Sequence, residues 1–292
     1  ADKYAEIGQK EKSLEIKLQA LEAESQSVQT QTFPFADDKV FALSRIATKY
    51  AEAGQKEKTA ETLAQAHQIV ETIVDDCRRI YTLVKLSNTY IKLGQKEKAI
   101  EILSQMLKAV KLVKYDYQKD PDVGRWGPGI WDASLPFFKK RKVEAYVKDC
   151  IRLEIAINFA RAGQYERGLE VTKAIKGLFE KTAPLEKIAL EYLKNGQYEQ
   201  ALNVVKSIDD SAHRDSTLAK IAIKSVEANQ LDYAVQAAEM IIYRPEKCCT
   251  LTEIAVKEMK AGQENKSVEI LSKAFDVVEN MKGADAVVIH AL

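Results

Sequence analysis

The chain of 292 residues has few of the residues that build metal, redox and disulfide sites. It contains four cysteines and three histidines, with no Cys-x2-Cys spacing and with the histidines far apart in sequence. These sparse side chains argue against a disulfide framework, a zinc site or a haem site, and no cofactor is expected. The adjacent Cys248 and Cys249 form a redox candidate, but buried helix thiols are the commoner case. The cysteine usage suits a reducing, cytoplasmic compartment.

Charge and hydropathy exclude further classes. The 44 basic and 43 acidic residues leave a net charge of +1, which gives no broad field to attract nucleic acid or an anionic membrane. No apolar run reaches the roughly 18 to 20 residues of a transmembrane helix. The sequence also lacks a Ser/His/Asp set, a glycine-rich phosphate loop and a His-Glu-x2-His motif, so a non-enzymatic protein is predicted.

What the sequence does contain is an internal repeat. A Gly-Gln or Asn-Gln pair recurs, and its last four copies are spaced 33 residues apart, whereas the earlier spacings are 46, 40 and 69. The first residues of the pairs are Gly8, Gly54, Gly94, Gly163, Gly196, Asn229 and Gly262.

Each pair lies between two amphipathic stripes. Before the pair, apolar residues stand at i, i+3, i+4 and i+7, as in Leu185, Ile188, Ala189 and Tyr192, which is one face of a helix. After it comes a second stripe, such as Ala201, Val205 and Ile208. The stripes predict helix hairpins with these buried positions between them: Ile46, Tyr50, Leu86, Tyr90, Ile188, Tyr192, Ile221 and Ile254.

The turn residue has a physical explanation. Helices often end on a residue with positive φ, which glycine adopts without a Cβ penalty and asparagine tolerates next best. The one exception to glycine in this column is Asn229, so the exception supports a positive φ throughout.

The pattern Leu-x2-Ile-Ala-x2-Tyr-x3-Gly-x-Tyr-Glu-x-Ala, clearest from Leu185 to Ala201, resembles the tetratricopeptide repeat. Its Ala-Gly-Gln-rich variety is similar to cyanobacterial and other bacterial repeat proteins. The chain departs from that family in having Leu for the usual Trp and mostly no terminal Pro. The resemblance implies an all-α, right-handed superhelix of antiparallel helix hairpins, and a protein or peptide as partner.

The predicted organisation has three parts. Residues 1–114 form N-terminal repeats whose first hairpin is incomplete, residues 115–144 form an insertion, and residues 145–292 form compact 33-residue repeats. A short insertion at 30–38, with Phe33-Pro34-Phe35, is expected to bridge the first hairpins. Neither end of the sequence has a polar capping repeat, so we expect a component of a larger polypeptide or assembly.

The insertion is the first candidate binding surface. It holds both tryptophans and is dense in proline and glycine, which forbids a helix and predicts a structured loop. Trp, Tyr and Arg dominate binding hot spots, and long loops on rigid scaffolds often carry function. Its predicted contact residues are Tyr117, Arg125, Trp126, Trp131, Phe137 and Phe138. The alternative is that its aromatic side chains fold back over the joint between the two repeat arrays.

The concave positions of the first helices are the second candidate. In the resembled family they lie six and three residues before the turn residue. Here they are apolar after the insertion, and the residues expected to contact a partner are Ile157, Leu190, Leu193, Ile223, Val226, Val256 and Met259. One interpretation is an apolar groove for an amphipathic helix or an apolar ligand. The other is that tighter coiling or an adjoining element buries the column as core.

A column of basic residues is a further candidate site, and RNA is a further candidate ligand. Fifteen residues before each turn residue stand Lys39, Arg79, Lys148, Lys181, Arg214 and Lys247, which are interpreted as an inter-repeat charge ladder or, alternatively, as a phosphate-binding strip. RNA binding is known for helical repeats, but the apolar groove and neutral charge argue against it.

Overall fold

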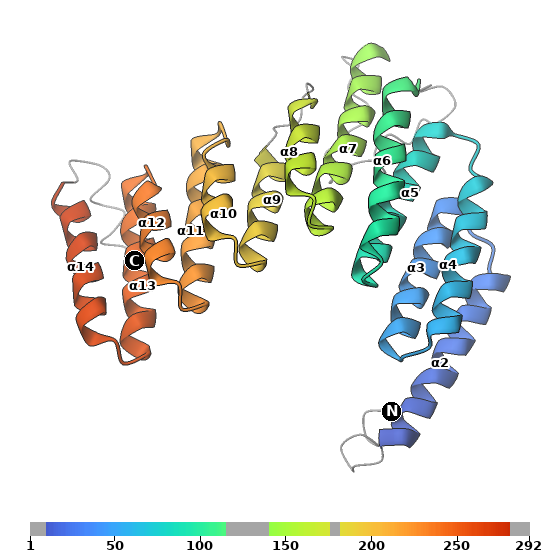
Figure 1. Cartoon of the computed structure of the whole chain (residues 1–292), viewed down its shortest axis with the longest axis horizontal. Coiled ribbons are helices and arrows are strands. Elements are labelled where there is room, and N and C mark those ends of the chain that lie inside the picture. Colours follow the sequence, from blue (N-terminus) through green and yellow to red (C-terminus); the bar gives the residue numbers. More distant parts are fainter. Residues whose placement is uncertain (1–9, 115–139, 176–181, 281–292) are drawn as a thin grey trace. The chain divides into compact units, whose positions relative to one another are not determined.

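The chain is an array of helix pairs. The computed structural model describes residues 10–114, 140–175 and 182–280, and in these ranges it has thirteen α-helices and no strand (Figure 1). Contacts divide the chain into two compact units, residues 1–163 with 174–179 and residues 164–173 with 180–292. No helix in the described ranges is long and apolar enough to span a bilayer.

The first unit contains six helices among its described residues. They are α2 (Lys10–Thr30), α3 (Ala36–Glu52), α4 (Lys56–Glu71), α5 (Asp76–Lys92), α6 (Lys96–Leu112) and α7 (Lys140–Arg161). Helices α3 and α4 form one hairpin and α5 and α6 the next, while α7 packs on both α5 and α6. Because α7 occupies the place of the following first helix, the repeat resumes after residues 115–139.

The second unit is built in the same way, with second helices that are shorter except for the last one. Its described helices are α8 (Tyr165–Lys173), α9 (Thr182–Lys194), α10 (Tyr198–Val205), α11 (Ser211–Glu227), α12 (Leu231–Met240), α13 (Arg244–Lys260) and α14 (Glu264–Glu279). The hairpins are α9–α10, α11–α12 and α13–α14, and the first helices α11 and α13 also pack on the first helix of the preceding hairpin.

The turn column adopts the expected conformation. Asn229 has φ 58°, and the glycines at positions 54, 94, 163, 196 and 262 have φ between 71° and 86°. In the α9–α10 turn the Gln197 N–H donates to the carbonyl of Tyr192 at 3.0 Å, and the Gly196 N–H donates to Leu193 at 3.0 Å. This pair of bonds is the Schellman motif, which satisfies carbonyls at the helix end. The prediction of positive φ is confirmed, except at Gly8, which lies outside the described residues.

The predicted core positions are confirmed. Ile46, Leu86, Ile188, Ile221 and Ile254 are at most 1% exposed. The tyrosines of the same stripes, Tyr50, Tyr90 and Tyr192, are buried as well. The stripe of every described first helix thus faces its own hairpin and its neighbours, as amphipathic periodicity requires.

Side chains also fix how one hairpin follows another. Asp75 caps α5 by accepting the Arg78 N–H at 2.7 Å, and Asp210 caps α11 through the His213 N–H at 2.8 Å. Phe33 of the predicted bridge packs on the core of the first unit. The guanidinium carbon of Arg78 lies 4.6 Å from the ring centre of Phe35, so the segment before α3 reaches α5.

The link from α12 to α13 is held by a buried carboxylate. Asp215 on α11 is buried, and its Oδ2 accepts the N–H groups of Ile242 at 3.1 Å and Tyr243 at 2.8 Å. These bonds fix the linker backbone, while the side chains of Ile242 and Tyr243 point to solvent.

Candidate functional site

The predicted concave column divides into buried and exposed members. Ile157 is buried and packs with Leu153 and Ile175, and Leu193 and Val226 are buried within the second unit. For these residues the second interpretation holds, because neighbouring elements cover them as core. Leu190 and Ile223 are half-buried.

Val256 and Met259 differ from the rest of the column. They are 43% and 44% exposed on α13, the last first helix of the described array. These two side chains are therefore the part of the column that a partner can reach.

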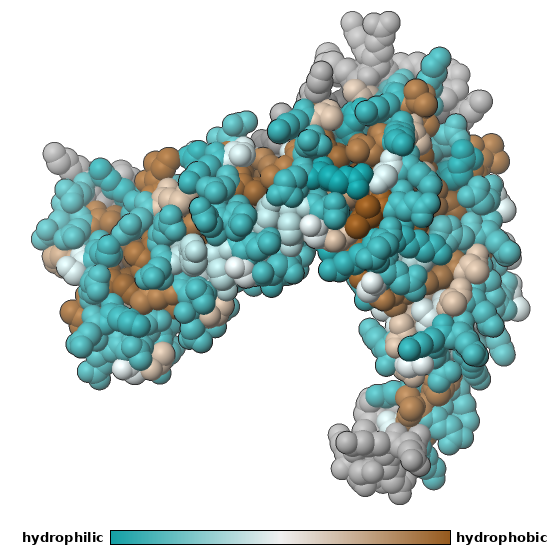
Figure 2. Space-filling model, in the orientation of Figure 1, coloured by the Kyte–Doolittle hydropathy of each residue, from teal (hydrophilic) through white to brown (hydrophobic). Residues whose placement is uncertain are grey.

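Helix α14, which pairs with α13 in the same hairpin, also carries exposed apolar residues. Its residues Val268, Leu271 and Phe275, spaced at i, i+3 and i+7 and thus on one helix face, are 61%, 41% and 63% exposed. We call Val256, Met259, Val268, Leu271 and Phe275 the end surface. Figure 2 shows apolar residues among polar ones over α13 and α14. Clustered exposure of large apolar side chains marks an interaction site more often than scattered exposure does.

The predicted insertion residues lie outside the described residues. This applies to Tyr117, Arg125, Trp126, Trp131, Phe137 and Phe138, so their role stays a prediction. Helix α7 begins at Lys140, within the range assigned to the insertion.

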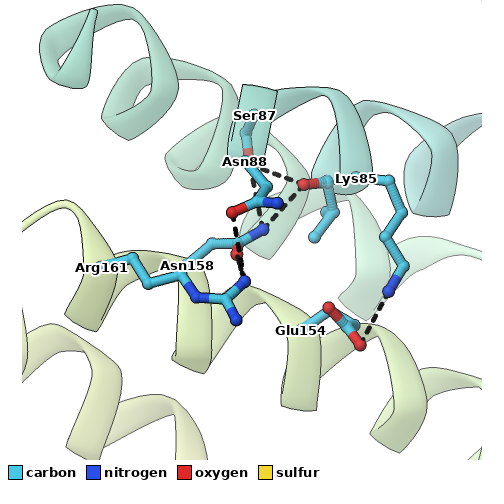
Figure 3. Close-up of polar contacts among 7 residues, drawn as sticks. Lys85, Ser87, Asn88, Glu154, Asn158 and Arg161 are labelled. Carbon is cyan, nitrogen blue, oxygen red and sulfur yellow. Dashed lines mark hydrogen bonds and ion pairs between the residues drawn. The ribbon is translucent and has the colours of Figure 1, made fainter. Parts of the chain in front are cut away.

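A polar cluster joins α5 to α7 across the insertion (Figure 3). The side-chain amide of Asn158, which is fully buried, donates to the Val84 carbonyl at 2.8 Å and to Ser87 Oγ at 3.3 Å. Arg161 donates to Asn88 Oδ1 at 3.1 Å and to Asn158 Oδ1 at 3.3 Å. Buried polar groups linked in this way specify one register between two helices.

A half-buried ion pair also joins α5 to α7. Lys85 Nζ is 2.8 Å from Glu154 Oε1. Burial alone would lower the pKa of Lys85, but attraction to Glu154 and Tyr81 outweighs it and raises that pKa above 10.5. The lysine therefore stays charged and paired, which suits a structural role.

The basic column binds the protein's own groups in the first unit. Lys39 Nζ donates to the Gln29 carbonyl at 3.0 Å, near the end of α2, and Arg79 donates to the Ile73 carbonyl at 3.3 Å and pairs with Asp76. Cations are favoured at helix C-termini, which explains basic residues that would oppose the dipole of their own helix. Both cations are thus occupied by the protein's own groups, but the inter-repeat charge ladder stays a prediction, and Lys181 lies outside the described residues.

The ion pairs that link successive hairpins of the second unit use other residues. Lys220 pairs with Glu186 at 2.6 Å, and Lys257 pairs with Glu227 at 2.9 Å. A third pair, Lys273 with Glu239 at 2.6 Å, joins the second helices of two hairpins. All three pairs are substantially exposed, so water screens them and each contributes little to stability.

Neither thiols nor carboxylates form a metal site in the described ranges. No group of three or more His, Cys, Asp or Glu side chains is placed to hold an ion there. Cys77, Cys150 and Cys248 are buried and Cys249 is exposed. Burial raises the pKa of the Cys77 thiol to about 12, and burial also raises that of Cys249, so neither is an activated nucleophile.

Two features were missed by sequence reasoning. Val268, Leu271 and Phe275 read as an ordinary second-helix stripe, and only the spacing from Gly262 relates them to buried positions of earlier repeats. Asn158 and Ser87 are polar residues beside apolar stripes, a signal that could have indicated a buried polar contact.

Comparisons with known proteins bear on the fold. No family model and no curated protein sequence matches the chain. Solved structures that match include a putative kinesin light chain from Podosopora anserina with nearly identical TPR-like repeats, at 17% identity and TM-score 0.37, covering 82% of this chain and 95% of that one. BtubC (BKLC) from P. vanneervenii has 11% identity, TM-score 0.39 and coverage of 92% and 94%.

A third match is Ton1535 from Thermococcus onnurineus NA1, at 15% identity and TM-score 0.30, covering 80% of this chain and 83% of that one. At such identities and scores no function is carried over. The fold is assigned from the repeated hairpins and their Schellman turns. The chain has a tetratricopeptide-like helical-repeat fold.

Proposed function

We propose that this protein is a non-enzymatic scaffold that binds a protein partner through the apolar surface of its helical array and through the inserted segment 115–144. The observation that carries the proposal is the exposure of Val256 and Met259, at 43% and 44%, in a column that is otherwise at least half-buried. Apolar side chains left exposed at the end of a rigid array are available for contact with another protein.

The insertion supplies the second part of the proposed surface. The helical repeat itself uses Leu, Ile, Ala and Tyr in its stripes, so a segment with both tryptophans is not needed to build it. Because α7 packs directly on α5 and α6, the repeat continues across this segment. These observations support an insertion kept for binding.

The test is a comparison of co-purifying proteins by mass spectrometry. The double variant Trp126→Ala with Trp131→Ala should keep its melting temperature within a few degrees and lose the partner found with the unmodified chain. The surface variant Met259→Asp should weaken binding of the same partner, whereas Lys266→Ala, which lowers the net charge by the same one unit at an exposed position of α14, should weaken it less. A stable double variant that retains the partner would remove the insertion from the interface.

A further inference from the structure

Three residues of the end surface, Met259, Val268 and Leu271, each have a buried counterpart in an earlier repeat, whereas Ile242, the counterpart of Phe275 in the second unit, is 66% exposed. Positions that share a distance from the turn residue are 33 or 66 residues apart in the second unit. Met259 thus corresponds to Val226 and Leu193, both buried. Leu271 corresponds to Val205, and Val268 to Leu202, which are buried too.

The earlier repeats also show what covers these positions. Helix α11 packs on both α9 and α10, and α13 packs on both α11 and α12. In each case the covering element is the first helix of the next hairpin. Its buried stripe has two large apolar residues followed by alanine: Leu218, Ile221 and Ala222 in α11, and Leu251, Ile254 and Ala255 in α13.

In the first unit, too, a long second helix contacts the first helix of the next hairpin. Leu271 and Phe275 lie nine and thirteen residues after their turn glycine, as Leu63 and His67 do after Gly54. Leu63 is buried, and the His67 ring lies 5.6 Å from that of Tyr90 on the following first helix, α5. Phe275 therefore occupies the same place in its helix as His67, which contacts the following first helix.

We propose that the end surface binds one amphipathic α-helix of a protein partner, which docks as the next first helix of the array. The partner helix presents large apolar residues at i and i+3 and a small residue at i+4, because these are the positions with which α11 and α13 cover their neighbours. This deepens the proposed function by naming the kind of segment that the scaffold takes.

Charge adds a preference to this interface. Lys257 on α13 pairs with Glu227, which lies two residues before its turn residue on the preceding first helix. On α13 the residue two positions before the turn residue Gly262 is Lys260, which is exposed. The partner helix should therefore carry an acidic residue where α13 carries Lys257.

The test uses the full chain and a peptide with the sequence of α11, residues 211–227, labelled for fluorescence anisotropy. In the array this helix packs on α9 and α10, which carry the buried residues Leu193, Leu202 and Val205, the counterparts of Met259, Val268 and Leu271. We expect binding that Leu271→Asp weakens about tenfold or more. The control Lys266→Ala lowers the net charge by the same one unit at an exposed position off the apolar face of α14 and should bind as the unmodified chain does.

Two peptide variants define the docking mode. The Ile221→Asp peptide should not bind, since its stripe is broken. The Lys224→Glu peptide, altered at the place of Lys257, should bind about two- to fivefold more tightly at low salt, as an exposed ion pair allows. Lys260→Glu in the protein should reverse this preference, and a preference unaffected by Lys260→Glu would contradict the proposed register.

Other occupants would appear as distinct outcomes. Peptide binding only to a chain that ends at Asn280 would show that residues 281–292 fill the surface, which overturns the proposal. A concentration-dependent dimer abolished by Leu271→Asp would assign the surface to a second copy and overturn it too. If the co-purifying partner is lost with the tryptophan pair but survives Leu271→Asp, the scaffold function stands and this assignment fails.

Discussion

The side-chain amide of Asn158 donates a hydrogen bond of 2.8 Å to the backbone carbonyl of Val84, a residue 74 positions earlier in the chain. Asn158 also bonds Ser87 and Arg161, so one buried side chain connects two helices on either side of the insertion. The contact sets the register of α7 against α5.

Asn158→Leu should lower the free energy of unfolding by about 1 to 3 kcal/mol, because Ser87 and Arg161 lose a buried partner that leucine cannot replace. Urea unfolding followed by circular dichroism measures the change. Asn203→Leu, at an exposed position on α10, is the control and should shift the free energy by no more than about 0.5 kcal/mol. Equal effects of the two substitutions would show that the cluster contributes nothing specific.

Ile188→Ala should cost about 2 to 5 kcal/mol, since it removes three carbons from a fully buried site and leaves a cavity. The exposed neighbour Lys187→Ala should be close to neutral. Thermal and urea unfolding of the second unit provide the measurement. A loss below about 1 kcal/mol for Ile188→Ala would mean that the hairpins repack around this position.

Gly196→Val and Gly196→Asn separate backbone strain from packing. A Cβ at Gly196 would meet no atom within 4 Å, so only the φ of 71° opposes a side chain. Valine should cost about 1 to 3 kcal/mol, and asparagine, which Asn229 shows to be accepted at this place in the repeat, should cost less than valine. The melting temperatures of the two variants decide the matter, and identical values would refute the strain argument.

His67 makes stability depend on pH. Burial lowers its pKa below 6.5, the positive charge of Lys98 lowers it further, and Nε2 is buried without a hydrogen-bond partner in the described part of the chain. The unfolded chain therefore binds a proton at a higher pH than the folded chain does. This contribution to stability is complete above about pH 6.5 and is lost as the pH falls from there towards the folded pKa.

The check compares urea unfolding at pH 7.5 and pH 5.5, a window above the ordinary range of the carboxylates. His67→Gln should remove part of the difference between the two pH values. If the variant shows the same difference as the unmodified chain, His67 is not its source.

The helix pairs and their turns could be predicted because they depend on local chemistry. The stripe of Ile188 and Tyr192 and the tolerance of Asn229 for positive φ are properties of short segments. Exposure on the end surface could not be predicted in this way. Leu271 and Val205 occupy equivalent places in their helices, yet Val205 is buried and Leu271 is exposed. Helix α10, which carries Val205, packs on the following helix α11, whereas α14 has no following helix in the described array.

The Asn158 cluster escaped prediction for a similar reason. Its partners Val84 and Ser87 lie more than 70 residues away, and the insertion hides the regular spacing that would have aligned them. Sequence periodicity shows which face of a helix is buried, but a single buried amide depends on the one helix that lies opposite.

Within the described array, the hairpin α13–α14 is supported by a neighbouring hairpin on one side alone. In a linear array each hairpin draws its stability from adjacent ones, so fraying should begin here and spread inward. Amides of α14 would then exchange with solvent sooner than those of α11. A helix bound at the end surface would slow that exchange from the outside, and the exchange rate of α14 would become a direct gauge of whether the site is occupied.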